Sequence, residues 1–294
     1  MKPSAWLSEW IRLVVFGNIW VAFGAASMYG CTTRLHNLPF SPLLFISIFG
    51  ATLFFYNYHR LFRKEVIYAL QVSDRHQWII DNHRKLQVFA LVGLLMGIGG
   101  IYPFLTLSFL ARFSPFILLA VFYVIPVWKE NGHWFRLRDL PYIKIFLVSA
   151  VWAFVTVFLP FMTQSNTWLP DTSVWLTTIQ RFIFIFAITL PFDIRDLEHD
   201  RKNQVKTFAS LWGIPKLKFI SRSLLVLTTV LGFVSFQLGF YTISLSVALL
   251  INCASTGYLI SQADEGLDEW FYAGWLDGAM LDQFFWILLL GSLF

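Results

Sequence analysis

Long apolar runs, separated by short polar connections, dominate the pattern of hydrophobic and polar positions along this chain. Each run is close to the ~20 predominantly apolar residues that an α-helix needs to cross a bilayer. The pattern predicts an all-α membrane protein, a bundle of about nine transmembrane helices forming a single multi-pass domain over residues 1–294. The candidate spans are residues 10–29, 41–58, 86–107, 109–127, 140–163, 174–192, 219–240, 242–260 and 270–293.

The third run and the connection before it refine this prediction. The run carries Gly93, Gly97, Gly99 and Gly100, and small residues allow helices in a membrane to approach closely. The connection from the second run is long for a compact bundle, and long connections are often functional. We therefore expect a close helix contact at the third run and a functional segment before it.

Composition agrees with a membrane protein and indicates its orientation. The chain is 57% hydrophobic and 13% charged, which is too little charge to cover a soluble globular surface. Lys and Arg concentrate at the N-terminus and in the connections after the second, fourth and sixth spans. This bias predicts a cytoplasmic N-terminus, in the inner membrane if the source is a bacterium. The net charge of +5 then reflects topology and not nucleic-acid binding. The last connection differs, with an acidic cluster and no base: Asp264, Glu265, Asp268 and Glu269.

An acidic segment follows the sixth span. Asp193, Asp196 and Asp200 have the spacing i, i+3, i+7, which places three carboxylates on one face of a helix. Such carboxylates repel one another unless a cation lies between them, and oxygen ligands suit Mg²⁺. Basic residues that could bind the oxygens of a diphosphate follow at once: Arg201, Lys202 and Lys206. This pattern fits a catalytic metal–diphosphate site held by the three aspartates, and it equally fits a solvated loop of mixed charge.

The same segment resembles the second aspartate-rich motif of the UbiA superfamily of intramembrane prenyltransferases, Asp-x-x-Asp-x-x-x-Asp followed by basic residues and Lys-Thr. Residues 193–213 carry the match, and residues 123–129, ending in Lys129, look like the tyrosine–lysine stretch of that family. The resemblance implies a UbiA-like bundle that binds an isoprenyl diphosphate and Mg²⁺ and transfers the prenyl group to a lipophilic acceptor. It also implies that Lys129 contacts the substrate.

The first aspartate-rich motif of that family is degenerate in this chain. It falls on residues 57–65, where its three acidic positions hold Tyr58, Leu61 and Glu65. The same stretch offers other side chains that we expect to bind the diphosphate directly: Asn57, Arg60, Arg63 and Lys64. Because arginine can contact phosphate oxygens with two donors at once, a basic surface replaces one metal-binding half of the site.

These two motifs leave more than one function open. The intact second motif favours an enzyme, either a prenyltransferase or a terpene cyclase of the same superfamily. The degenerate first motif favours a non-catalytic membrane protein that binds an isoprenoid lipid or a partner. The two enzyme alternatives act on an isoprenyl diphosphate and require Mg²⁺.

Two ionisable residues at similar depth suggest a buried ion pair. At 1.5 Å per residue, Arg181 lies roughly 17 Å from the cytoplasmic end of the sixth span and Asp282 roughly 18 Å from that of the ninth. Ionisable groups at such depth need a partner or a polar cavity. We therefore expect Arg181 to pair with Asp282, or alternatively with Asp277.

Overall fold

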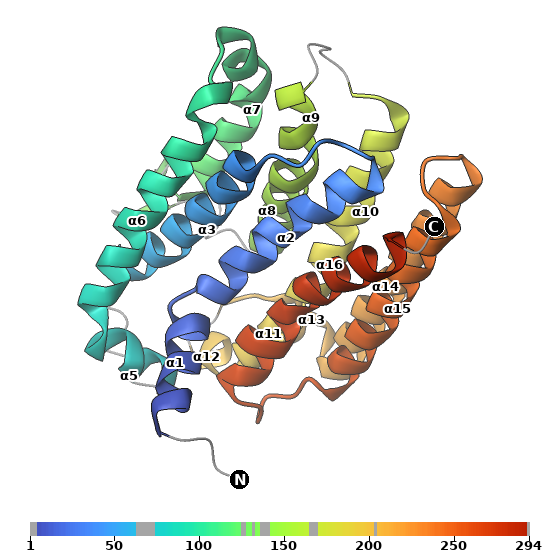
Figure 1. Cartoon of the computed structure of the whole chain (residues 1–294). Helices are drawn as coiled ribbons and strands as arrows, with labels where there is room; N and C mark the ends of the chain where they lie inside the picture. Colours follow the sequence, from blue (N-terminus) through green and yellow to red (C-terminus); the bar gives the residue numbers. More distant parts are fainter. Residues whose placement is uncertain are drawn as a thin grey trace.

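The computed structural model describes residues 5–62, 74–124, 128–130, 133–135, 142–164, 170–202 and 205–292. Arg63 and Lys64 lie outside the described residues. Within these ranges the chain is an all-helical bundle apart from one short antiparallel hairpin, β1 (Trp128–Glu130) and β2 (His133–Phe135) (Figure 1). The all-α fold class predicted from the hydrophobic pattern is confirmed.

The helices follow one another in the order drawn in Figure 1. Two segments are π-helical turns, Phe154–Phe158 and Phe271–Leu276. Tyr102–Phe104 is a 3₁₀ turn. The α-helices are α1 (Ala5–Phe16), α2 (Ile19–Leu35), α3 (Pro42–Phe62), α5 (Asp74–Asp81), α6 (His83–Ile101), α7 (Leu107–Val124), α8 (Ile143–Ala153), α9 (Leu159–Gln164), α10 (Thr172–Thr189), α11 (Phe192–Arg195), α12 (Leu197–Lys202), α13 (Phe208–Trp212), α14 (Ile214–Gln237), α15 (Ile243–Gln262) and α16 (Asp277–Gly291).

Several of these helices are long and apolar enough to cross a membrane, which supports a multi-pass integral membrane protein. Among the described residues, five helical segments meet that criterion: His83–Phe104, Ile143–Gln164, Thr172–Arg195, Ile214–Gln237 and Ile243–Gln262. The bent pair of α1 and α2 would make a sixth. The axis of the chain bends by 56° between α1 and α2. The count of nine spans and the cytoplasmic N-terminus stay predictions.

Glycines bring α3 and α6 into close contact. A Cβ on Gly93 would lie 2.7 Å from the carbonyl oxygen of Gly50, and one on Gly100 would lie 2.4 Å from that of Leu43. Both distances are too short for any side chain, so the two backbones touch along this interface. Gly99 has nothing within 4 Å of its Cβ position. The expected close contact is therefore found, with Gly93 and Gly100 in it and Gly99 outside it.

The expected ion pair between Arg181 and Asp282 is wrong in the described structure. The Arg181 guanidinium instead donates from Nη1 to the carbonyl oxygen of Met28 at 2.9 Å, across the bundle interior. Asp282 accepts hydrogen bonds from Asn252 Nδ2 at 3.0 Å and from Ser255 Oγ at 2.8 Å. Equal depth in the membrane does not determine how each helix is rotated about its axis, and here the two side chains point to different neighbours.

Candidate functional site

One end of the bundle gathers segments that are far apart in the sequence. Helices α1, α5, α11 and α12 meet at the lower end of Figure 1, together with the turn between α15 and α16. That turn contacts α1, where Phe16 packs on Trp270 at 4.8 Å, and it is also fixed to α2, where Trp20 Nε1 donates to the carbonyl oxygen of Gly274 at 2.9 Å. The acidic segment predicted as the functional site therefore lies beside the last connection and the segment before α6.

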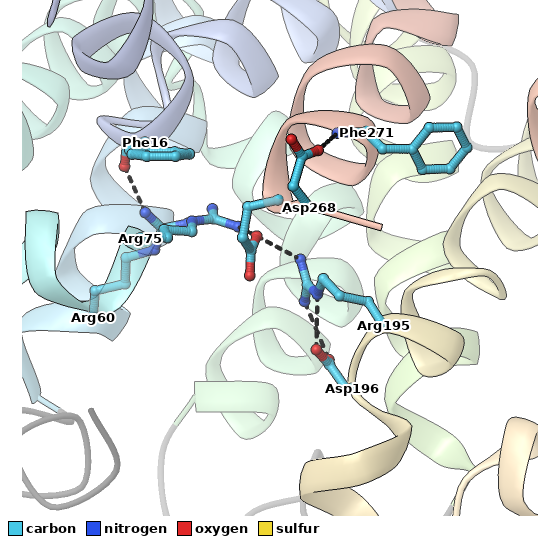
Figure 2. Close-up of polar contacts among 8 residues, drawn as sticks. Phe16, Arg60, Arg75, Arg195, Asp196, Asp268 and Phe271 are labelled. Carbon is cyan, nitrogen blue, oxygen red and sulfur yellow. Dashed lines mark hydrogen bonds and ion pairs between the residues drawn. The ribbon is translucent and has the colours of Figure 1, made fainter. Parts of the chain in front are cut away.

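A network of ion pairs connects these segments. Arg75 Nη1 of α5 lies 2.8 Å from Glu269 Oε2, and Arg195 Nη1 of α11 lies 3.3 Å from the same oxygen. Arg195 also binds its neighbour Asp196 with two donors, Nε to Oδ1 at 2.8 Å and Nη2 to Oδ2 at 3.1 Å. Figure 2 shows Arg195 pointing toward Asp196 on one side and toward Arg75 on the other. We call Arg75, Glu269, Arg195 and Asp196 the arginine–carboxylate network.

Aromatic rings and neighbouring charges stabilise the ionised groups of this network. The Arg195 guanidinium lies over the Phe192 ring at 5.0 Å and near the Tyr272 ring at 5.9 Å, distances at which a cation and an aromatic face attract. Burial disfavours the charged form of Asp196 and of Glu269. Burial is the largest single influence on both groups, but the neighbouring basic groups, Arg195 first and Arg75 among them, together outweigh it, so the pKa of each carboxyl lies below its usual value. Both carboxylates are thus held ionised against arginine.

Asp193 has a different role from Asp196. Its side chain is 5% exposed and its Oδ2 accepts a hydrogen bond of 3.1 Å from the backbone nitrogen of Phe208, at the start of α13. Thr207 caps the same helix through Ser210. Asp193 therefore fixes the segment that follows the acidic motif to α11, which positions the basic stretch beside the motif.

The other predicted residues of the second motif lie toward the surface. Asp200 is half-buried in α12, where its backbone nitrogen donates to Asp196 O at 2.9 Å. Arg201 is exposed and forms an ion pair of 3.5 Å with Glu265. Lys206 is exposed after α12, and Lys202 ends α12 with no described side-chain position. The three aspartates thus share one end of the bundle without facing one common point.

Lys129 lies exposed on β1 of the hairpin, opposite Trp134. Within the predicted tyrosine–lysine stretch at 123–129, residues 125–127 lie outside the described ranges. Its role in binding a substrate stays a prediction.

Two first-motif residues, Asn57 and Arg60, form hydrogen bonds at the break between α1 and α2. Asn57 is completely buried; its Nδ2 donates to the carbonyl oxygens of Gly17 and Leu53, and its Oδ1 accepts from Asn18 at 2.9 Å. Arg60 Nη1 donates to Phe16 O, the last residue of α1, at 2.6 Å (Figure 2). Asn18 has the left-handed φ of 66°, so this turn needs such support. Asn57 and Arg60 therefore stabilise the α1–α2 break.

A small aromatic cluster fixes α5 over this break. Trp78 is buried against Phe16 in an edge-to-face contact of 5.9 Å, and Phe16 packs on Trp270 at 4.8 Å. Arg75 contributes from the same helix, with its guanidinium 5.9 Å from the Phe16 ring. Part of the long connection before α6 is thus folded against this break, and its functional role stays a prediction.

Sequence reasoning missed Arg75, Arg195 and Glu269 as site residues. The last connection is an acidic cluster with no base of its own, and its partners come from other segments: Glu269 pairs with Arg75 and Arg195, and Glu265 with Arg201. Charge balance was the available signal. The last connection is acidic, and the connections after the second, fourth and sixth spans are basic. Because all of them are predicted on the same side of the membrane, opposite charges would bring them together.

The described side chains do not form a ready metal centre. No group of three or more His, Cys, Asp or Glu side chains is gathered at metal-binding distances in the part of the chain that the structure describes. Both oxygens of Asp196 face Arg195, and one oxygen of Asp193 faces the Phe208 nitrogen. Carboxylate oxygens remain the correct donor type for Mg²⁺, but their arrangement here binds cationic and backbone donors.

Known structures with the same fold include archaeal UbiA homologues. A UbiA homologue from Archaeoglobus fulgidus bound to GPP and Mg²⁺ has 11% identity and a TM-score of 0.61, with 96% of this chain and 99% of that chain covered. A digeranylgeranylglyceryl phosphate synthase has 15% identity and a TM-score of 0.56, covering 97% and 98%. The apo UbiA homologue from Aeropyrum pernix K1 has 12% identity and a TM-score of 0.60, covering 92% and 95%. At these identities the likeness establishes the fold.

The sequence itself decides the family. No curated protein matches the chain, but the model of the UbiA prenyltransferase family matches residues 82–288. The match includes the acidic segment at 193–200 and excludes the degenerate motif at 57–65. This chain belongs to the UbiA prenyltransferase family.

Proposed function

We propose that this chain is a membrane prenyltransferase that binds an isoprenyl diphosphate at the arginine–carboxylate network and transfers the prenyl group to a lipophilic acceptor. The supporting observation is the intact acidic segment of a UbiA-family chain placed against two partly buried arginines, Arg75 and Arg195. GPP and DMAPP, each with Mg²⁺, occupy Archaeoglobus fulgidus relatives of the same fold. The acceptor class is proposed from the membrane location of the bundle.

Charge is the chemical basis of the proposal. Ionising the carbon–oxygen bond of a prenyl diphosphate leaves negative charge on the departing diphosphate, and preorganised cations stabilise that charge. Arg75 and Arg195 already lie on a common carboxylate oxygen, so both guanidinium groups converge on one anionic position. A diphosphate that competes with Glu269 for these groups would meet two fork-shaped donors, which suit phosphate oxygens. Arg201, Lys202, Lys206 and Lys129, with Arg63 and Lys64, are proposed to surround it.

Mg²⁺ enters the proposal as a partner of the substrate. Asp193, Asp196 and Asp200 supply oxygen donors of the kind that Mg²⁺ prefers, and when bound the ion would neutralise charge on the diphosphate. In the described arrangement Asp196 is paired with Arg195. The chain's own contribution is to bind and orient the diphosphate with arginine.

A second candidate function is a non-catalytic protein that binds an isoprenoid lipid. The observation in its favour is that Asn57 and Arg60, expected at the substrate, instead form hydrogen bonds to the α1–α2 break. With two carboxylates of the first motif replaced, that half of the site has a structural role in the described chain.

Pyrophosphate release separates the two candidates. The purified protein is incubated with Mg²⁺ and dimethylallyl, geranyl, farnesyl or geranylgeranyl diphosphate, with and without a lipid extract that supplies acceptors. A prenyltransferase releases pyrophosphate only when an acceptor is present, and a terpene cyclase releases it without one. Tight binding of a prenyl diphosphate without release under either condition would establish the non-catalytic candidate.

A further inference from the structure

A buried arginine lies far from the arginine–carboxylate network. Arg181 is near the middle of α10 and is 3% exposed. Asp193 follows it by 12 residues on nearly continuous helix, roughly 18 Å at 1.5 Å per residue. The Arg181 side chain therefore belongs to the bundle interior and not to the end where the diphosphate is proposed to bind.

The protein leaves most of this guanidinium without a partner. Arginine has five N–H donors, and within the described residues one of them is used, by Nη1 on the carbonyl oxygen of Met28. No carboxylate of those residues lies within 4 Å of it, and Asp282 is bound to Asn252 and Ser255. Arginine stays protonated in proteins, so a full positive charge is buried in a membrane bundle without a counterion in the described part.

Neutral polar groups surround the charge and are already satisfied by one another. His36 Nε2 lies 2.7 Å from Thr177 Oγ1, and Tyr241 OH lies 2.7 Å from the same oxygen. Tyr241 OH donates to Gln180 Oε1 at 3.2 Å, and Gln180 Nε2 donates to a backbone oxygen of α14 at 2.9 Å. These side chains bridge α2, α10 and α14 and bring no negative charge, so the counterion must come from outside the described protein.

We propose that Arg181 is the centre of a second binding site, between α2 and α10, for a lipophilic carboxylate. A single guanidinium matches a planar monoanion in charge and geometry, because two parallel N–H donors fit two carboxylate oxygens. The depth of Arg181 in the bundle indicates the second property of the ligand. Arg181 follows the start of α10 by nine residues, about 14 Å along the helix, so an anion that reaches it must have an apolar body compatible with the bundle. Phe161 packs edge-on against His36 at 4.9 Å beside this position.

Cys31 provides a way to replace the ligand from within the protein. Its thiol is completely buried on α2, one turn after Met28 and on the same face, and the carbonyl oxygen of Met28 accepts from Arg181. A Cys31→Asp substitution places a carboxylate beside the guanidinium with little change in volume. If the site binds a carboxylate, this internal carboxylate occupies it, whereas the neutral Cys31→Ser leaves it open.

The test measures binding of carboxylates to the purified protein in lipid nanodiscs. Dodecanoate and 2-naphthoate are added below their aggregation concentrations, and thermal unfolding is followed by tryptophan fluorescence; dodecanol and sodium chloride are the neutral and small-anion controls. We expect at least one carboxylate to raise the melting temperature of the wild type, and the two arms distinguish an acyl from an aromatic ligand. Dodecanol and chloride leave it unchanged.

Variants decide whether Arg181 is the site. Carboxylate affinity is expected to fall at least tenfold in Arg181→Gln and in Cys31→Asp, and to be unchanged in Cys31→Ser and in Arg112→Gln, which alters another buried arginine. Binding of a prenyl diphosphate stays the same in all four, which separates this site from the proposed catalytic one. The proposal is overturned if no carboxylate stabilises the wild type, if chloride does so equally, or if Cys31→Asp still binds. Cys31→Asp keeps the test valid should Arg181→Gln not fold.

Discussion

Replacing Glu269 by glutamine tests whether the arginine–carboxylate network stabilises the site. The Glu269 side chain is 17% exposed and its Oε2 lies 2.8 Å from Arg75 and 3.3 Å from Arg195. Glutamine keeps the size of the side chain and removes the charge, so two guanidinium groups then face a neutral oxygen and each other. The substitution weakens both contacts at once.

The expected loss follows from the burial of the pair. A hydrogen bond to a charged group contributes about 1.5–3 kcal/mol, and the two contacts share one oxygen, so we expect a total loss of about 2–4 kcal/mol. For domains of 150–250 residues, 1 kcal/mol corresponds to roughly 2–4 °C. The melting temperature of Glu269→Gln should therefore fall by on the order of 5–10 °C.

Glu265→Gln is the matched control in the same connection. Glu265 lies 3.5 Å from Arg201, and the two side chains are 35% and 61% exposed. Exposed pairs contribute about 0–1 kcal/mol because solvent screens them, so this variant should melt close to the wild type. Thermal unfolding followed by tryptophan fluorescence measures both. Equal effects of the two substitutions, or a loss below about 0.5 kcal/mol for Glu269→Gln, would refute the stabilising role of the network.

Three further predictions follow from the structure. Because the pKa values of Asp196 and Glu269 are lowered in the folded protein, these carboxylates contribute their full stability above about pH 4, the ordinary carboxyl range, and lose it as the pH falls through the folded pKa. Acidification below pH 4 should therefore lower the melting temperature of Glu269→Gln by less than that of the wild type. Gly93→Ala should destabilise by about 1–3 kcal/mol, since its Cβ would clash with Gly50 O at 2.7 Å, whereas Gly99→Ala should be neutral in the same unfolding assay. Asn57→Ala should lower the free energy of unfolding by about 2–4 kcal/mol, because the buried hydrogen bonds of the Asn57 side chain are lost. Since Asn57 stabilises the α1–α2 break, the affinity for a prenyl diphosphate should stay unchanged.

The parts of the fold that depend on local pattern could be predicted from the sequence. The predicted apolar runs are mostly helical in the described ranges, because bilayer thickness sets the length of such a run, but the first run, 10–29, is interrupted by the α1–α2 break. The contact of α3 with α6 was also visible, since a stripe of glycines has few other uses in a membrane helix. Gly99 shows the limit: the spacing alone did not show which glycine faces the neighbour.

The parts that depend on pairing between distant segments could not be predicted. Arg75 and Glu269 are 194 residues apart in the chain, and nothing local to either residue indicates the other. Arg181 and Asp282 were paired by depth alone, which fails because depth does not determine rotation about the helix axis. Asn57 matched a family motif by position, yet its amide group forms hydrogen bonds to the backbone of the α1–α2 break.

The central claim is that the acidic segment binds a prenyl diphosphate, and Asp196 tests it most directly. Binding of geranyl diphosphate is measured by isothermal titration calorimetry with and without Mg²⁺, for the wild type, Asp196→Asn and the surface control Asp81→Asn, whose side chain contacts Gln77. The account predicts Mg²⁺-dependent binding by the wild type and Asp81→Asn, weakened at least tenfold in Asp196→Asn. Binding by Asp196→Asn with the affinity and Mg²⁺ dependence of the wild type would contradict it.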